Sequence, residues 1–265
     1  MKNTIFWCEF PRKINLDLLN KILSRLNLNI IVYLASKSLK EFNNFKDRFS
    51  KIKNIKTIGC WPILEKKKGY WLSGFSDKNS IKSLLQYKNL KLKIDTEPPL
   101  EDNKFSYFKI GLYFLKYMLF KKAQNKDLLS EILMNFKKED LIISTFPLPK
   151  FLLNKLINIQ DLRNSNLNLM YYSTLIPKIL RPFYKIYFKY IVNKYKKISN
   201  VITAVGLTSP GILGNEPIYI NLKEFKRDLE FIKTLNTNTI VIFELSGVLK
   251  RKNPEEWFKA ILDYI

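Results

Sequence analysis

Short apolar runs alternate along the whole chain with longer stretches in which apolar residues recur at helical spacing. This alternation is typical of strand–helix units that build a parallel sheet. The expected strands cover residues 4–9, 29–35, 55–63, 90–97, 141–146, 167–174, 201–206 and 239–245. The expected helices cover residues 16–26, 38–49, 79–87, 105–122, 127–137, 151–157, 178–196 and 222–235, and a last helix begins at Pro254.

The number of these units indicates the fold class. Eight strand–helix pairs follow one another with no remainder, whereas a doubly wound sheet usually has about five or six strands. The chain has 265 residues, close to the roughly 250 that an eight-stranded α/β barrel typically needs. No break in composition divides the chain. The sequence therefore predicts an α/β protein with a single (β/α)8 barrel of the TIM type, spanning residues 1–265 as one domain.

Composition adds an expectation about the compartment. No apolar stretch reaches the roughly 18 residues of a membrane span, and the first residues lack the apolar core and cleavage site of a signal peptide. A soluble, cytoplasmic protein is therefore expected. Cys8 and Cys60 fall within predicted strands and have neither disulfide nor metal-ligand spacing, so both are expected to be buried free thiols.

The formal net charge of +23 raises the question of an acidic partner. The excess is mainly lysine spread along the chain, which favours solvated helix faces over a nucleic-acid surface. A different possibility comes from two aromatic stretches flanked by lysines, residues 105–122 and 178–197. Each could lie on an anionic membrane surface, or each could simply cover the barrel.

The chain contains no histidine. Catalytic devices that need an imidazole, such as the Ser-His-Asp triad, are therefore excluded, as is a zinc site of the usual kind. Any acid–base chemistry must come from carboxylates. No cofactor is expected, although an all-oxygen Mg²⁺ or Ca²⁺ site built from Asp95, Glu97 and Glu9 stays open.

Four acids fall at the C-terminal ends of predicted strands, where barrel enzymes hold their active sites. They are Glu9, Asp95, Glu97 and Glu244. Side-chain alternation along residues 90–97 turns Asp95 and Glu97 towards the barrel axis. Two acids that face each other across a cleft suit the cleavage of a glycosidic bond. The alternative is that these acids only satisfy backbone amides or pair with Lys93.

Aromatic residues accompany the acids and form the predicted substrate-binding set: Trp7, Trp61, Tyr70, Trp71 and Tyr172. Flat rings fit the apolar faces of sugars, while carboxylates take hydroxyl groups. The alternative is that the rings belong to the core. The Gly- and Pro-rich stretch 206–217 is expected to be a rim or gating loop rather than a phosphate cradle, because Glu216 would repel an anion.

Asp95-Thr96-Glu97 resembles the end of the fourth strand in chitinase-like glycoside hydrolases, which closes on Asp-x-Glu. The resemblance implies that Glu97 is the acid and that Asp95 orients the substrate. Two positions depart from the family pattern: Lys93 stands where a further aspartate is expected, and the eighth strand ends in Glu244 rather than a tryptophan.

The leading hypothesis is a glycoside hydrolase-like barrel that acts on a carbohydrate or other small polar ligand. In it Glu97 is the acid, Asp95 its orienting partner, and Glu244 or Glu9 the opposing carboxylate. One rival is a metal-dependent lyase or phosphoesterase that uses the same acids. The other is a non-catalytic barrel that binds an acidic partner or a membrane surface.

Overall fold

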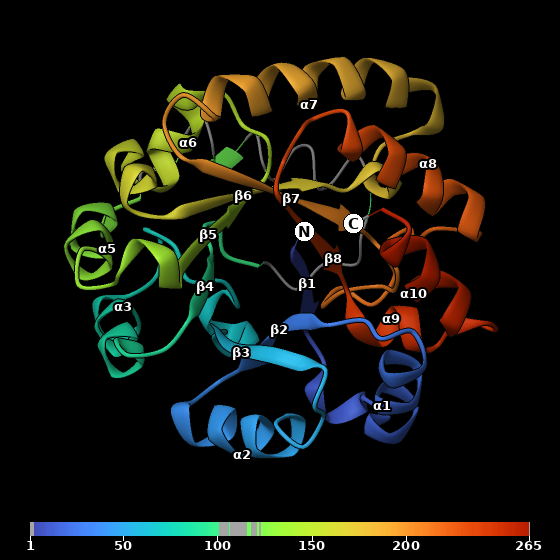
Figure 1. The fold of residues 1–265 in the computed structure, drawn as a ribbon. Coiled ribbons are helices and arrows are strands. Elements are labelled where there is room, and N and C mark those ends of the chain that lie inside the picture. Colours follow the sequence, from blue (N-terminus) through green and yellow to red (C-terminus); the bar gives the residue numbers. More distant parts are fainter. Residues whose placement is uncertain (1–2, 101–105, 107–115, 118–120, 122, 265) are drawn as a thin grey trace.

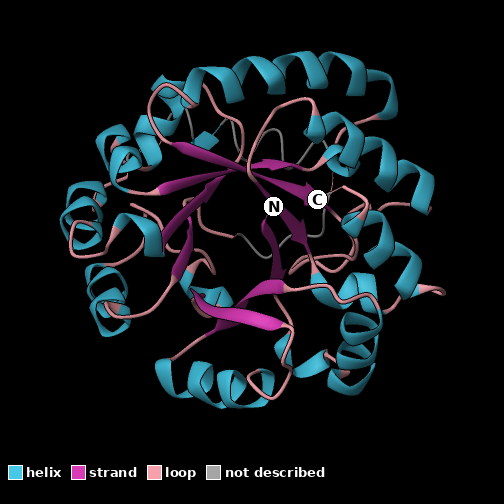
Figure 2. Cartoon of the chain, in the orientation of Figure 1, coloured by secondary structure: helices cyan, strands magenta, loops and turns pink. Residues whose placement is uncertain are grey.

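The computed structural model describes residues 3–100, 106, 116–117, 121 and 123–264. Eight parallel strands form a closed barrel in sequence order, and β1 pairs with β8 to complete it (Figure 1). Helices surround the barrel on the outside (Figure 2). The predicted (β/α)8 class is therefore confirmed.

The strands agree closely with the predicted ones. They are β1 (Asn3–Cys8), β2 (Ile30–Ser36), β3 (Ile55–Pro62), β4 (Leu92–Asp95), β5 (Leu141–Thr145), β6 (Asn166–Tyr171), β7 (Asn200–Gly206) and β8 (Thr239–Phe243). The α-helices in the described part of the chain are α1 (Leu16–Arg25), α2 (Leu39–Phe49), α3 (Lys78–Lys82), α5 (Lys126–Leu133), α6 (Lys150–Leu156), α7 (Arg181–Tyr195), α8 (Leu222–Lys233), α9 (Leu245–Leu249) and α10 (Pro254–Leu262).

Alternation along each strand divides the buried side chains into two sets. Phe6 and Cys8 of β1 point outwards and join the core between the sheet and the helices. Ile5 and Trp7 point inwards and belong to a second cluster that fills the barrel. Cys60 belongs to the outer set, and both cysteines are buried and unpaired, as predicted.

Glycine makes room for the large rings inside the barrel. Trp7, Tyr33 and Gly59 lie side by side on β1, β2 and β3. The Trp7 and Tyr33 rings meet edge to face, with centroids 5.1 Å apart. A Cβ atom on Gly59 would lie 2.3 Å from the Tyr33 ring. Any larger residue at this position would therefore displace that ring.

Helix starts follow local sequence signals. Asn15, Ser38, Asp77 and Asn221 precede α1, α2, α3 and α8, and each side chain accepts a hydrogen bond from a backbone N–H of the first turn. Such caps satisfy donors that a helix start otherwise leaves without partners. In the described part of the chain, none of the helices combines the length and apolar character that crossing a membrane would require.

The largest differences from the predictions lie in two segments. The eighth strand ends at Phe243, and the residues after it begin the short helix α9. The helix expected over residues 79–87 divides into α3 and a 3₁₀ turn, Ser83–Tyr87. Most of the helix expected over residues 105–122 lies outside the described residues.

Candidate active site at the C-terminal end of the barrel

The acids of β1 and β4 meet inside the C-terminal end of the barrel. Glu9 directly follows β1, Asp95 ends β4, and Glu97 lies two residues further on. All three side chains are buried. Charges on Asp95 and on Glu9 both raise the pKa of Glu97, so the three carboxyl groups lie within electrostatic reach of one another.

Asp95 forms a buried ion pair with Lys93. The Lys93 ammonium donates to Asp95 Oδ2 at 2.6 Å, and only 2% of the lysine side chain is exposed. Burial lowers the pKa of Lys93, and the charge of Asp95 opposes that effect. The ammonium also lies 3.2 Å from the centroid of the Trp61 ring and 5.0 Å from that of Trp7. A cation over aromatic faces gains attraction from the ring electrons, so these rings help to hold the buried charge.

Glu97 lies in surroundings that favour its neutral form. Burial is the largest cause that raises the pKa of this carboxyl well above its ordinary value, and the charge of Asp95 is the second. Lys93 opposes the shift but is already paired with Asp95. Glu97 therefore retains its proton to higher pH than an isolated glutamate does.

Glu9 is held by a tyrosine from the loop after β3. The Tyr70 hydroxyl donates to Glu9 Oε1 at 2.7 Å. The pKa of Glu9 is raised to about 8, mainly by burial and also by the charges of Glu244 and Glu216, while the hydrogen bond from Tyr70 opposes the shift.

The loop after β7 lies over Glu9. A Cβ atom on Gly211 would lie 3.2 Å from Glu9 Oε2 and 3.0 Å from Glu216 Oε1. Glu216 Oε1 also accepts from the backbone N–H of Leu213 at 3.1 Å. The absence of a side chain at Gly211 therefore brings the loop backbone close to the Glu9 carboxyl.

The structure gives Glu244 a different environment. Its side chain caps α9 by accepting from the backbone N–H groups of Ser246 and Gly247, at 3.2 and 2.9 Å. It also accepts from the hydroxyls of Ser209 and Ser246. The prediction that Glu244 lies within the eighth strand is wrong, because these donors stop the strand and start the helix. Its carboxylate is already engaged by four donors.

The predicted aromatic residues divide between the interior and the rim. Trp7, Trp61 and Tyr172 belong to the cluster inside the barrel, and Tyr70 joins it from the loop. Trp71 is partly exposed and packs edge to face on Tyr70, with centroids 5.7 Å apart.

Phe243 is an aromatic residue of the site that the sequence analysis did not select. Its ring lies 6.4 Å from that of Trp61 and 5.5 Å from that of Tyr172, measured between centroids. Phe146 continues this wall, 6.3 Å from Tyr172. Phe243 pairs in register with Trp7 of β1, and both rings point inwards. Alternation along the predicted eighth strand, which places Val241 and Phe243 on one face, was the signal in the sequence.

Several buried polar atoms in this region have no hydrogen-bond partner among the described residues. Two are carboxyl oxygens that face the interior, Glu9 Oε2 and Asp95 Oδ1. Two are indole N–H groups, those of Trp7 and Trp61. Because buried polar groups are normally paired, these acceptors and donors are suited to hydrogen bonds with water or a polar ligand.

A metal site does not emerge from the same acids. Within the described residues, no three Asp, Glu or Cys side chains are arranged to hold one metal ion. Asp95 already has a cationic neighbour in Lys93.

The fold is shared with enzymes of known structure. The barrel resembles the PgaB (BpsB) glycoside hydrolase domain from Bordetella bronchiseptica, with 10% identity, a TM-score of 0.61, and coverage of 97% of this chain and 98% of that chain. It also resembles the catalytic domain of beta-amylase from Paenibacillus polymyxa, with 10% identity, a TM-score of 0.50, and coverage of 99% and 97%. D-allulose 3-epimerase from Methylomonas sp. matches with 9% identity, a TM-score of 0.51, and coverage of 100% and 98%.

No family model matches the sequence, and no curated protein matches it significantly. At about a tenth identity, the structural likenesses establish the fold alone. The expected resemblance to TIM-barrel glycoside hydrolases is confirmed at that level.

Proposed function

We propose that this protein is a glycoside hydrolase-like enzyme that acts on a carbohydrate. Glu97 is the general acid, Asp95 orients the substrate, and Glu9 is the opposing carboxylate. Glu244 is left out of this mechanism because its carboxylate caps α9.

One observation carries the proposal: two buried carboxyls with raised pKa values, one after β1 and one after β4, lie within electrostatic reach of each other in an aromatic-walled interior. A carboxyl that keeps its proton near neutral pH is what a general acid needs. The unpartnered oxygens of Glu9 and Asp95 are suited to sugar hydroxyls. The rings of Trp61, Tyr172 and Phe243 are suited to the apolar faces of a sugar.

The proposed reaction is the hydrolysis of a glycosidic bond. Glu97 gives its proton to the glycosidic oxygen as the bond to the anomeric carbon breaks, and the leaving sugar departs as an alcohol. In its ionised form, Glu9 either takes a proton from the water that attacks the anomeric carbon and later releases that proton to solvent, or bonds to the anomeric carbon itself. In the second case, water that is deprotonated by Glu97 then breaks the bond to Glu9. Hydrolysis consumes one water, and Glu97 regains a proton before the next cycle. The Lys93 ammonium offsets the charge of Asp95 throughout.

The structural neighbours give independent support. Those with TM-scores of 0.50 or above include a glycoside hydrolase domain, a beta-amylase and a sugar epimerase. One barrel fold hosts many different activities. The structural likeness therefore supports a carbohydrate substrate only in combination with the buried carboxyls of the site.

The experiment is a turnover screen on nitrophenyl glycosides and unlabelled oligosaccharides, followed by Glu97→Gln. This substitution keeps the side-chain shape and removes the proton donor, so the rate should fall by about 10² or more while sugar binding persists. Asp161→Asn is the matched control, because Asp161 is a buried acid with a raised pKa that lies outside the barrel, bonded to Ser130. It should leave the rate unchanged.

Two results would contradict the proposal. One is that Glu97→Gln turns over an identified substrate at the wild-type rate. The other is that Glu97→Gln unfolds the protein, which would make Glu97 a structural acid. Activity that disappears with a chelator and returns with Mg²⁺ would instead support the metal-dependent rival.

A further inference from the structure

Helix α7 has two apolar faces, whereas a helix that covers a barrel needs one. Phe188, Ile191, Val192 and Tyr195 form the inner face and are buried against the barrel. The outer surface carries a second apolar set, which we call the α7 stripe: Ile179, Phe183, Ile186 and Tyr190. Their exposed fractions are 80%, 69%, 71% and 58%.

The spacing of the α7 stripe makes it a continuous surface. Its positions follow one another at intervals of four, three and four residues, which places them along one side of a helix. From Phe183 to Tyr190 the helix rises by about 10 Å, and Ile179 extends the stripe into the 3₁₀ turn Lys178–Leu180. Leu180 and Tyr187, exposed by 50% and 37%, widen the stripe. Isolated exposed apolar residues are ordinary, but an aligned set of this size indicates a binding surface.

The segment of the chain that carries the α7 stripe has charged residues of one sign. Residues 162–215 contain no aspartate or glutamate. Seven basic residues occur between residues 178 and 197: Lys178, Arg181, Lys185, Lys189, Lys194, Lys196 and Lys197. An apolar stripe within a lysine-rich segment is typical of helices that lie on anionic membranes.

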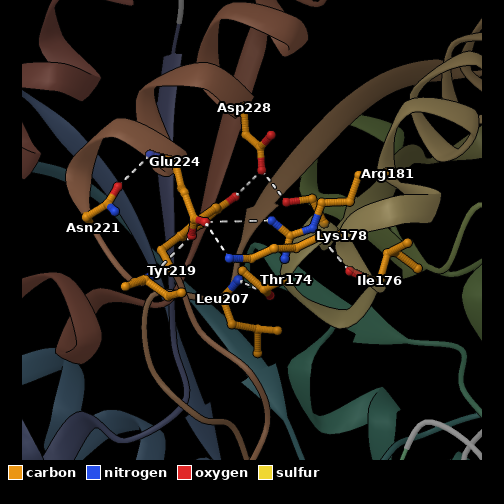
Figure 3. Close-up of polar contacts among 11 residues, drawn as sticks. Thr174, Ile176, Lys178, Arg181, Leu207, Tyr219, Asn221, Glu224 and Asp228 are labelled. Carbon is orange, nitrogen blue, oxygen red and sulfur yellow. Dashed lines mark hydrogen bonds and ion pairs between the residues drawn. The ribbon is translucent and has the colours of Figure 1, made fainter.

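The start of this segment is fixed to α8 by polar contacts (Figure 3). Glu224 of α8 lies 3.8 Å from the Lys178 ammonium and 4.0 Å from the Arg181 guanidinium. Arg181 also donates to the backbone carbonyl of Ile176 at 3.1 Å. These contacts hold the short 3₁₀ turn Lys178–Leu180 against α8, so the stripe is preformed and need not fold on binding.

Two neighbouring helices add exposed apolar residues at the same end of the barrel. In the ring of helices, α7 lies between α6 and α8 (Figure 1). Phe151 in the first turn of α6 is 68% exposed, and Ile220, just before α8, is 69% exposed. Each helix begins where the preceding strand ends, so these residues lie towards the end of the barrel that carries the candidate site.

We propose that the α7 stripe binds the surface of an anionic lipid bilayer, with its apolar side chains at the level of the acyl chains and its lysines at the headgroups. An anionic surface complements the charge of the segment. A second copy of this chain would instead bring like charges together if two stripes met face to face. This inference does not depend on the proposed catalytic function.

The test is co-sedimentation of the full chain with two kinds of vesicles, at low and at high salt. One kind is phosphatidylcholine alone, and the other is an equal mixture of phosphatidylcholine and phosphatidylglycerol. Wild-type protein should bind the anionic vesicles, and high salt should weaken the binding. The double variant Phe183→Ser, Ile186→Ser should bind these vesicles at least about tenfold more weakly, because it loses buried apolar surface.

Met134→Ser is the matched control, because Met134 is a 67% exposed apolar residue next to α5, outside the stripe. It should bind as the wild type does, and all variants should melt at similar temperatures. Failure of the wild type to bind anionic vesicles would overturn the proposal, as would equal binding by the double variant. A wild-type dimer that the double variant converts to monomer, without lipid binding, would identify a second copy as the occupant instead.

Discussion

At the scale of single residues, the hydrogen bond from Tyr70 affects the pH at which Glu9 ionises. The Tyr70 hydroxyl donates to Glu9 Oε1 at 2.7 Å, and this bond opposes the shift of the Glu9 pKa to about 8 that burial mainly causes. If ionised Glu9 is required for turnover, the rate should rise with pH through this region. Tyr70→Phe removes the stabilising donor, so the rising limb of the pH–rate profile should move to higher pH.

The control for this shift is Tyr87→Phe, which removes a buried hydroxyl outside the barrel interior and should leave the profile in place. The profiles of kcat/KM should be compared on one substrate. If Tyr70→Phe left the rising limb unchanged, ionisation of Glu9 would not be the cause of that limb.

Glu9 should also make folding stability depend on pH. The folded state keeps its proton up to about pH 8, whereas the unfolded chain loses it near the ordinary value of 4.5. Between these values the folded state binds more protons, so the free energy of unfolding falls as pH rises. The contribution of Glu9 is complete at acid pH and is lost as pH approaches 8, with a slope of at most about 1.4 kcal/mol per pH unit.

Glu9→Gln removes this proton, so the stability of the variant relative to wild type should increase from pH 4.5 to pH 8. Urea unfolding at a series of pH values measures the difference. Glu131→Gln, at an exposed position on α5, is the control and should give a much flatter difference. A Glu9→Gln difference that does not vary with pH would show that Glu9 ionises normally.

At the scale of elements, the boundary between β8 and α9 depends on one carboxylate. Glu244 accepts two backbone and two hydroxyl hydrogen bonds there. Glu244→Ala should lower the free energy of unfolding by about 2 kcal/mol or more, because it removes a cap and leaves buried donors without partners. Asn221→Ala removes an exposed cap with one such bond and should cost about 1 kcal/mol.

The measurement is denaturant unfolding of both variants, with turnover of the folded fraction as a second readout. Folded Glu244→Ala should still turn over substrate, with the rising limb moved to lower pH, because the charge of Glu244 raises the pKa of Glu9. If Glu244→Ala had the stability of the wild type but no turnover, Glu244 would be a catalytic residue rather than a helix cap.

The elements differ in how well sequence patterns predict them. Alternation along β4 correctly turned Lys93 and Asp95 inwards and Leu92 and Ile94 outwards, because a pleated strand allows no other arrangement once one face is buried. The start of α9 was missed, since glutamate is not among the usual capping residues. Ser209, which is distant in the chain, also donates to this carboxylate.

At the scale of the whole molecule, the barrel could be predicted because its evidence is repeated eight times along the chain. The enclosure of the acids could not be predicted in the same way. It depends on the position of Gly211 over Glu9 and of Tyr70 beside it, and both loops are placed by tertiary packing. The sequence therefore predicted that Glu9, Asp95 and Glu97 face the interior, but not that Glu244 caps a helix or that burial raises the pKa of Glu9.

Closure of the barrel also determines the balance of charge inside it. Glu9, Asp95 and Glu97 lie near one ammonium, that of Lys93. Full ionisation would leave two uncompensated negative charges in a region of low polarity, which is costly. Two retained protons, on Glu9 and Glu97, leave only the balanced Lys93–Asp95 pair. The proposed mechanism therefore depends most on the proton of Glu97.

The infrared difference spectrum between the wild type and Glu97→Gln at neutral pH tests this directly, with no substrate needed. A protonated carboxyl and a carboxylate absorb at well-separated frequencies. If Glu97 is protonated as proposed, Glu97→Gln should lose the carbonyl band of a protonated carboxyl and leave the carboxylate bands unchanged. Loss of a carboxylate band instead would mean that Glu97 is ionised in the folded protein, and it would contradict the proposed role of Glu97 as the proton donor.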